Sequence, residues 1–130
     1  MKVGNKKQSS ILTSNSLEEY RLTHDRCAVC YSKGRSWNDR LEIHHIIAGR
    51  HGGKDKHDER CLVLLCRDCH VGVHSGGGRS LSLGQVLQAK LEADGSVDVS
   101  FLAGLRGRVG LKEDPSPLPL WAEEARRDNQ

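Results

Sequence analysis

Aromatic residues are scarce in this chain of 130 residues: Phe, Trp and Tyr make up 4% of it, and all hydrophobic residues together only 36%. A domain of this length buries a modest share of its surface, so a low apolar content leaves it with a thin core. The sequence has no run of about eighteen apolar residues and no long apolar segment near its start, which argues against a membrane span and against secretion. We therefore expect a small cytoplasmic protein, stabilised by something other than a larger core.

Cysteine and histidine are plentiful instead, with five Cys and seven His. Four of the cysteines form two C-x-x-C pairs, which are Cys27 with Cys30 and Cys66 with Cys69. Two residues between thiols let one tight turn direct both sulfurs at one ion, and two such turns complete a tetrahedral site. In a reducing compartment this pattern indicates a structural zinc ion (Zn²⁺), whereas a redox pair or buried free thiols are the alternatives.

The hydrophobic pattern predicts alternating strands, loops and helices along the chain. A capping box at Ser16 predicts a short helix, and Gly95 closes a later helical pattern that starts after Ser82. The expected elements are strands at 41–47 and 61–65, a loop at 48–60, and helices at 67–75, 83–94, 99–109 and 121–127. We divide the chain into a flexible N-terminal segment (1–15), a core (16–78) and a helical C-terminal extension with a proline-rich spacer (79–130).

Four histidines lie on the predicted strand and helix that border the zinc motif. His70 and His74 are four residues apart, so they share one helix face, the spacing by which one helix supplies two ligands to one ion. His44 and His45 are adjacent on a strand, so their rings point to opposite faces. One of these two can therefore join the helical pair on a metal ion, while the other faces elsewhere and is available as a general base.

In their order, the segments CAVC, LEIHHI and LVLLCRDCHVGVH resemble the HNH endonucleases, in particular the zinc-knuckle type found in many phage and bacterial enzymes. The resemblance covers residues 27–75. It implies an α+β fold, a small ββα-metal (treble-clef-like) core stapled by zinc, here with additional helices at both ends. It also implies an enzyme that hydrolyses DNA phosphodiester bonds, by nicking or by double-strand cleavage.

The resemblance assigns roles to individual residues. His45 matches the general base, and His44, His70 and His74 match the ligands of a catalytic divalent metal. Glu42 lies on the same strand face as His44, where it either orients a ligand imidazole or is an ordinary solvated residue. Three imidazoles are softer ligands than Mg²⁺ prefers, so we expect Mn²⁺, Ni²⁺ or Co²⁺ to serve as well as Mg²⁺, with Zn²⁺ a further candidate.

One position departs from the family pattern. The middle letter of the family name stands for an Asn that hydrogen-bonds across the loop and fixes the base, and Cys61 occupies its place. A thiol is a weak donor and acceptor, which puts the reaction rate in doubt. The alternatives are therefore a weak or inactive zinc-dependent DNA-binding module and, from a different class, a zinc-stabilised protein-interaction domain.

The expected partner is DNA, and no membrane is involved. Residues 33–60 hold seven Lys or Arg against five Asp or Glu, so the basic excess lies around the predicted loop. Candidate phosphate contacts in this stretch are Arg35, Arg40, Arg50, Lys54 and Lys56, although each of them is as readily part of a solvated charged face. His51 and His57 in the same loop are predicted to be bystanders. Phage packaging proteins or a second copy of the chain are further candidate partners.

Overall fold

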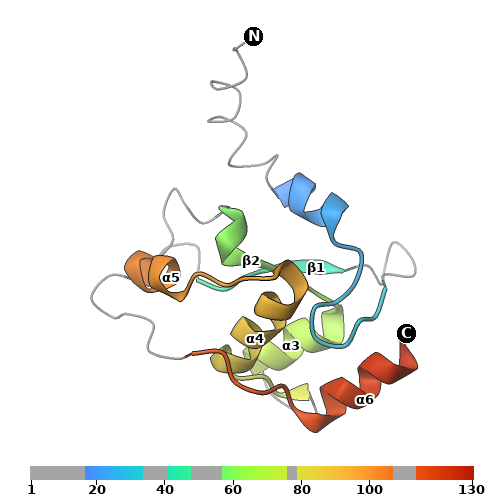
Figure 1. Cartoon of the computed structure of the whole chain (residues 1–130). Coiled ribbons are helices and arrows are strands. Elements are labelled where there is room, and N and C mark those ends of the chain that lie inside the picture. Colours follow the sequence, from blue (N-terminus) through green and yellow to red (C-terminus); the bar gives the residue numbers. More distant parts are fainter. Residues whose placement is uncertain (1–16, 34–40, 48–56, 76–78, 107–113) are drawn as a thin grey trace.

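The computed structural model describes residues 17–33, 41–47, 57–75, 79–106 and 114–130 (Figure 1). The chain begins with a short helix at 17–23, as the sequence predicts, although the proposed cap at Ser16 lies outside the described residues. The elements that follow are β1 (Glu42–His45), the 3₁₀-helix η2 (Glu59–Cys61), β2 (Leu62–Leu65), α3 (Arg67–Ser75), α4 (Leu83–Asp94), α5 (Val99–Arg106) and α6 (Leu120–Asp128). None of the helices in these ranges has the length and apolar character needed to cross a bilayer.

The two strands form an antiparallel sheet that contacts α3. All four residues of β2 are buried, which explains why the sequence LVLL is continuously apolar and does not alternate. In β1 only His44 is buried, and the two-residue period puts Glu42 on the same face as His44 and His45 on the opposite face. The mixed helices and small sheet confirm the predicted α+β class.

The first C-x-x-C turn is fastened directly to the sheet. The backbone N–H of Ala28 donates to the carbonyl oxygen of Leu64 at 2.8 Å, and that of Tyr31 donates to the carbonyl of Cys27 at 2.9 Å. Tyr31 has a φ of 67°, in the left-handed region that closes a tight turn. This turn therefore carries its two thiols to the C-terminal end of β2, where the second pair begins.

The C-terminal helices pack on the same core. As predicted, α4 starts after Ser82 and ends at Gly95, whose φ of 83° is favourable for glycine. The structure adds a capping box between Ser82 and Gln85. Helix α6 fastens its end to the first C-x-x-C turn, because Arg126 donates to the carbonyls of Ala28 and Val29 at 3.0 and 2.8 Å. The C-terminus of the chain thus lies against the sheet core.

Two predicted boundaries are wrong. The strand predicted over 41–47 is shorter, and the predicted loop ends in η2, so Cys61 belongs to that helix and not to β2. The Asp58 side chain caps η2 by accepting from the N–H of Arg60 at 2.9 Å, while the N–H of Cys61 donates to the Asp58 carbonyl. This turn delays the start of β2 by one residue. The ladder is still extended past β1, because the N–H of Ile46 donates to the Cys61 carbonyl at 2.8 Å.

Candidate metal centres and active site

The four cysteines of the two C-x-x-C pairs meet at one point of the core. Their sulfurs all lie within 4.8 Å of one another, and the Sγ atoms of Cys30 and Cys66 are 3.7 Å apart. Metal–sulfur bonds of about 2.3 Å in a tetrahedron place neighbouring sulfurs about 3.8 Å apart, so the cluster has the dimensions of a four-sulfur site. Cys27, Cys30 and Cys69 are buried, and Cys66 is partly exposed.

Hydrogen bonds among the thiols favour their charged form at two positions. The contact with Cys27 is the main cause that lowers the pKa of Cys30, and it also lowers the pKa of Cys66 to about 7. The thiolate is the form that binds metal. Arg79 adds positive charge beside the cluster, since its Nη1 lies 3.5 Å from the Sγ of Cys69.

The second cluster consists of His44 from β1 and of His70 and His74 from α3. Their candidate ligand nitrogens lie within 4.8 Å of one another, and their ring centroids are 4.9 to 5.2 Å apart. His44 is 7% exposed, and burial together with the neighbouring His70 and His74 lowers its pKa to about 3. It is therefore neutral at physiological pH, which is the form that binds metal.

Glu42 contacts this second cluster directly. Its Oε1 lies 2.8 Å from Nδ1 of His70, and its Oε2 lies 3.5 Å from Nη2 of Arg67. The sequence allows Glu42 to be either a solvated strand residue or a residue that orients a ligand imidazole. The contact with His70 favours the second role. With Nδ1 of His70 engaged in this way, Nε2 is the nitrogen presented to an ion.

His45 points away from the cluster, as expected for the neighbour of His44 on a strand. Its Nε2 lies 3.1 Å from Nδ1 of His57, and the two rings are 5.2 Å apart. The sequence prediction treats His57 as a bystander, but the structure brings it to the candidate base. No local sequence pattern indicates this contact, because His45 and His57 are twelve positions apart in the chain.

The comparisons with known proteins address the same segment. Residues 27–76 match the model of the HNH endonuclease family. This segment is similar to an HNH domain, and we call it the HNH domain. The match includes both cysteine pairs, Glu42 and the four histidines on β1 and α3. Comparison with curated proteins and comparison with solved structures both gave no match.

Within the HNH domain, Cys61 occupies a buried position at the end of η2. Among the described residues it joins neither ligand group, consistent with its being a core thiol and not a fifth ligand of the four-sulfur site. Its backbone carbonyl accepts from the N–H of Ile46 at 2.8 Å, which ties η2 to the residue that follows β1.

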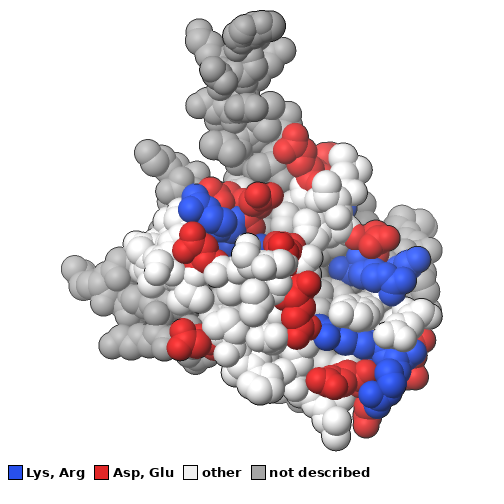
Figure 2. Space-filling model, in the orientation of Figure 1, with Lys and Arg blue, Asp and Glu red and all other residues white. Residues whose placement is uncertain are grey.

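The structure does not test the predicted phosphate contacts of the HNH domain. Arg35, Arg40, Arg50, Lys54 and Lys56 all lie outside the described residues. On the face shown in Figure 2, acidic and basic side chains of the described part of the chain are interspersed, and they form no continuous basic surface there. The DNA contacts of this domain stay a prediction.

Proposed function

We propose that this protein is a metal-dependent endonuclease that hydrolyses DNA phosphodiester bonds, with His45 as the general base. The observation that carries the proposal is the convergence of three imidazoles in a segment that matches the HNH family, with a fourth on the opposite strand face. HNH domains are generally nucleases, so DNA is the substrate that the family implies.

The proposed ligands of the catalytic ion are His44, His70 and His74. Metal–nitrogen bonds of about 2.0–2.1 Å require ligand nitrogens no more than about 4 Å apart, so small rotations of the side chains would bring the three within range. A divalent ion held by these residues would supply positive charge that stabilises the negative charge of the phosphodiester during hydrolysis. We expect Mn²⁺, Ni²⁺ and Co²⁺ to support cleavage at least as well as Mg²⁺, because imidazole nitrogen suits them better.

The four cysteines are the proposed site of a structural zinc ion. The dimensions of the sulfur cluster and the burial of Cys27, Cys30 and Cys69 suit zinc. Such a site stabilises the fold of a thin core and takes no part in the reaction. It holds the start of α3 against the first C-x-x-C turn, and α3 in turn carries two of the imidazoles.

The proton-transfer step belongs to His45. Its Nε2 lies 3.1 Å from Nδ1 of His57. In this step the imidazole of His45 removes a proton from a water molecule in line with the scissile bond. The contact with His57 also limits rotation of the ring, which keeps the basic atom in one orientation.

One observation favours a different function. Cys61 replaces the Asn that orders the loop in the resembling enzymes, and this change would suit a DNA-binding module without cleavage. The two functions share both metal sites and differ in their need for His45. Loss of the His45 imidazole would leave DNA binding intact but would slow hydrolysis by about 10²- to 10⁴-fold.

The test is nicking of supercoiled plasmid by the full chain across a series of Mg²⁺, Mn²⁺, Co²⁺, Ni²⁺ and Zn²⁺, with wild type and His45→Ala purified in parallel. We expect wild type to nick DNA, and the rate to fall by about 10²- to 10⁴-fold in the variant, the usual contribution of a general base. Zinc content and circular dichroism of both proteins establish equal folding.

Three outcomes would count against parts of the proposal. Absence of cleavage by wild type in every metal would overturn the nuclease function, and tight DNA binding in the same samples would favour the binding module. Equal cleavage by His45→Ala would overturn the role of His45 but not the activity. Cleavage that copurifies with both proteins at the same low level would indicate a contaminating nuclease.

A further inference from the structure

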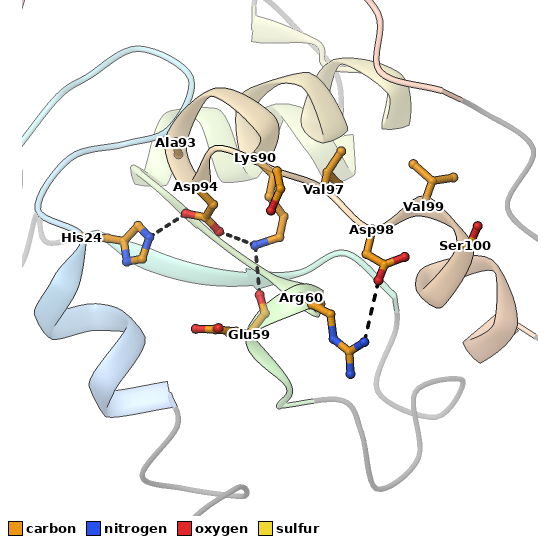
Figure 3. Close-up of a pocket in the computed structure, with 11 residues that line it drawn as sticks. His24, Glu59, Arg60, Lys90, Ala93, Asp94, Val97, Asp98, Val99 and Ser100 are labelled. Carbon is orange, nitrogen blue, oxygen red and sulfur yellow. Dashed lines mark hydrogen bonds and ion pairs between the residues drawn. The ribbon is translucent and has the colours of Figure 1, made fainter.

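A buried lysine of α4 connects the C-terminal helices to the HNH domain. Lys90 is only 2% exposed, and its Nζ donates to the backbone carbonyls of Glu59 and Leu62 at 2.9 and 2.6 Å. Its third contact is the carboxylate of Asp94, one turn further along α4, at 2.5 Å. Figure 3 shows the ammonium between Asp94 and the Glu59 carbonyl. All three protons of the ammonium are therefore used.

The surroundings of Asp94 account for the burial of this charge. The Tyr20 hydroxyl donates to Oδ2 of Asp94 at 3.1 Å, and Nε2 of His24 lies 2.7 Å from its Oδ1. A buried charge is tolerated only when it is paired and hydrogen-bonded, and both conditions hold for the Lys90–Asp94 pair. The N-terminal helix at 17–23 and α4 thus converge on one polar contact with the segment before β2.

The two carbonyls that Lys90 holds lie on either side of Cys61. Leu62, which carries one of them, is the cross-strand partner of His45, and the Cys61 carbonyl between them accepts from the N–H of Ile46. Two residues before Glu59 lies His57, whose ring contacts His45. Residues 57–62 thus contact His45 in two ways, through the strand pairing of Leu62 and through the side chain of His57. Lys90 holds this stretch of chain in place.

We propose that Lys90 is a positioning residue for the nuclease reaction: it holds residues 57–62 so that His45 keeps a productive orientation. This inference rests on the proposed function, because it needs His45 to be the base. It gives α4, which lies outside the segment matched by the HNH family, a part in the activity.

A control variant in α6 distinguishes a positioning role of Lys90 from a merely structural one. Like Lys90, Arg126 donates to two backbone carbonyls of another segment and pairs with an acid of α4, Glu92 at 2.7 Å. The carbonyls that it holds belong to the first C-x-x-C turn, not to residues 57–62. Arg126→Met therefore removes a similar fastening without touching the segment opposite His45.

The experiment compares wild type, Lys90→Met and Arg126→Met, all as full chains saturated with zinc. Because Lys90→Met removes the cation that pairs with Asp94, Lys90→Met with Asp94→Asn serves as a second variant, in which residue 94 carries no charge either. We expect kcat for nicking to fall on the order of 10- to 100-fold in both Lys90 variants, with KM nearly unchanged, and to stay at the wild-type value in Arg126→Met.

Amide hydrogen exchange supplies a readout that does not need activity. Exchange at the N–H of Ile46, which donates to Cys61, should accelerate in the Lys90 variants only, whereas exchange at Ala28 should accelerate in Arg126→Met only. Unchanged exchange at Ile46, or an equal loss of kcat in Arg126→Met, would overturn the inference. If wild type cleaves no DNA in any metal, the proposed function fails. Faster exchange at Ile46 in the Lys90 variants alone would then still support the contact of Lys90 with residues 57–62. Faster exchange at Ile46 in Arg126→Met as well would refute it.

Discussion

Nε2 of His45 and Nδ1 of His57 lie 3.1 Å apart, although twelve positions of chain separate them. The contact joins the one histidine of β1 that faces away from the three-imidazole cluster to the turn that precedes η2. An imidazole whose second nitrogen is engaged has a defined tautomer and a restricted orientation. His57 therefore has the geometry of a residue that prepares His45 for proton transfer.

This contact predicts the effect of substituting His57. His57→Ala should lower kcat for DNA nicking by about 10- to 100-fold, because the base loses its partner, while the metal content stays the same. His57→Asn should recover part of the rate, since its Oδ1 can accept a hydrogen bond near the position of Nδ1. Steady-state nicking assays in Mn²⁺ measure both. A wild-type kcat in His57→Ala would show that the contact has no part in the reaction.

A second prediction concerns Glu42, which lies 2.8 Å from His70. Glu42→Gln and Glu42→Ala should weaken binding of Mn²⁺ or Co²⁺ at the three-imidazole cluster by about 10- to 100-fold, because an oriented and polarised imidazole is a better ligand. Isothermal titration with the zinc-loaded protein measures the affinity. Arg67→Ala is the matched control: Arg67 is largely exposed and touches the same carboxylate only at 3.5 Å, so its loss should change the affinity little. Equal affinities in wild type and Glu42→Ala would refute the role.

The five cysteines provide a third prediction. Cys66→Ala and Cys69→Ala should lose the zinc ion and most of the folded structure, because metal binding contributes on the order of 10 kcal/mol to the folding of such domains. Cys61→Ala removes a thiol of the same core that lies outside the cluster, so it should keep one zinc per chain. Zinc content and far-ultraviolet circular dichroism, before and after chelation, distinguish the two classes. A folded, metal-free Cys66→Ala protein would contradict a structural zinc site.

Local sequence signals predicted much of this fold. The bounds of α3 agree with the prediction, and so do the two ends of α4 at Ser82 and Gly95, because capping boxes and C-terminal glycines act within a few residues. The convergence of the two C-x-x-C pairs was likewise predictable, since each pair is set by its own tight turn. The opposite orientation of His44 and His45 follows from the strand period alone.

The contacts that the sequence did not reveal join segments far apart in the chain. From the sequence alone, Lys90 is indistinguishable from a surface lysine of an amphipathic helix. Its partners Glu59 and Leu62 lie about thirty positions earlier in the chain. His57 depends on a turn whose capping residue, Asp58, competes with continuation of the strand. Such pairings are decided by how α4 and η2 pack together, which no local pattern encodes.

Two helical glycines supply the last prediction. A Cβ on Gly72 of α3 would lie 1.9 Å from the backbone oxygen of Arg79, so Gly72→Ala must displace the main chain that carries Arg79 to Cys69. We expect a loss of about 1–3 kcal/mol or more in the free energy of unfolding, as in other overpacked cores.

Gly104 of α5 is the control, because nothing lies within 4 Å of the Cβ that it would gain. Gly104→Ala should raise the free energy of unfolding by roughly 0.5–1 kcal/mol, since alanine is the better helix former. Urea denaturation of the zinc-loaded variants measures both changes. Equal stability of Gly72→Ala and wild type would mean that residue 79 does not pack against α3, and the contact of Arg79 with the four-sulfur cluster would then lose its support.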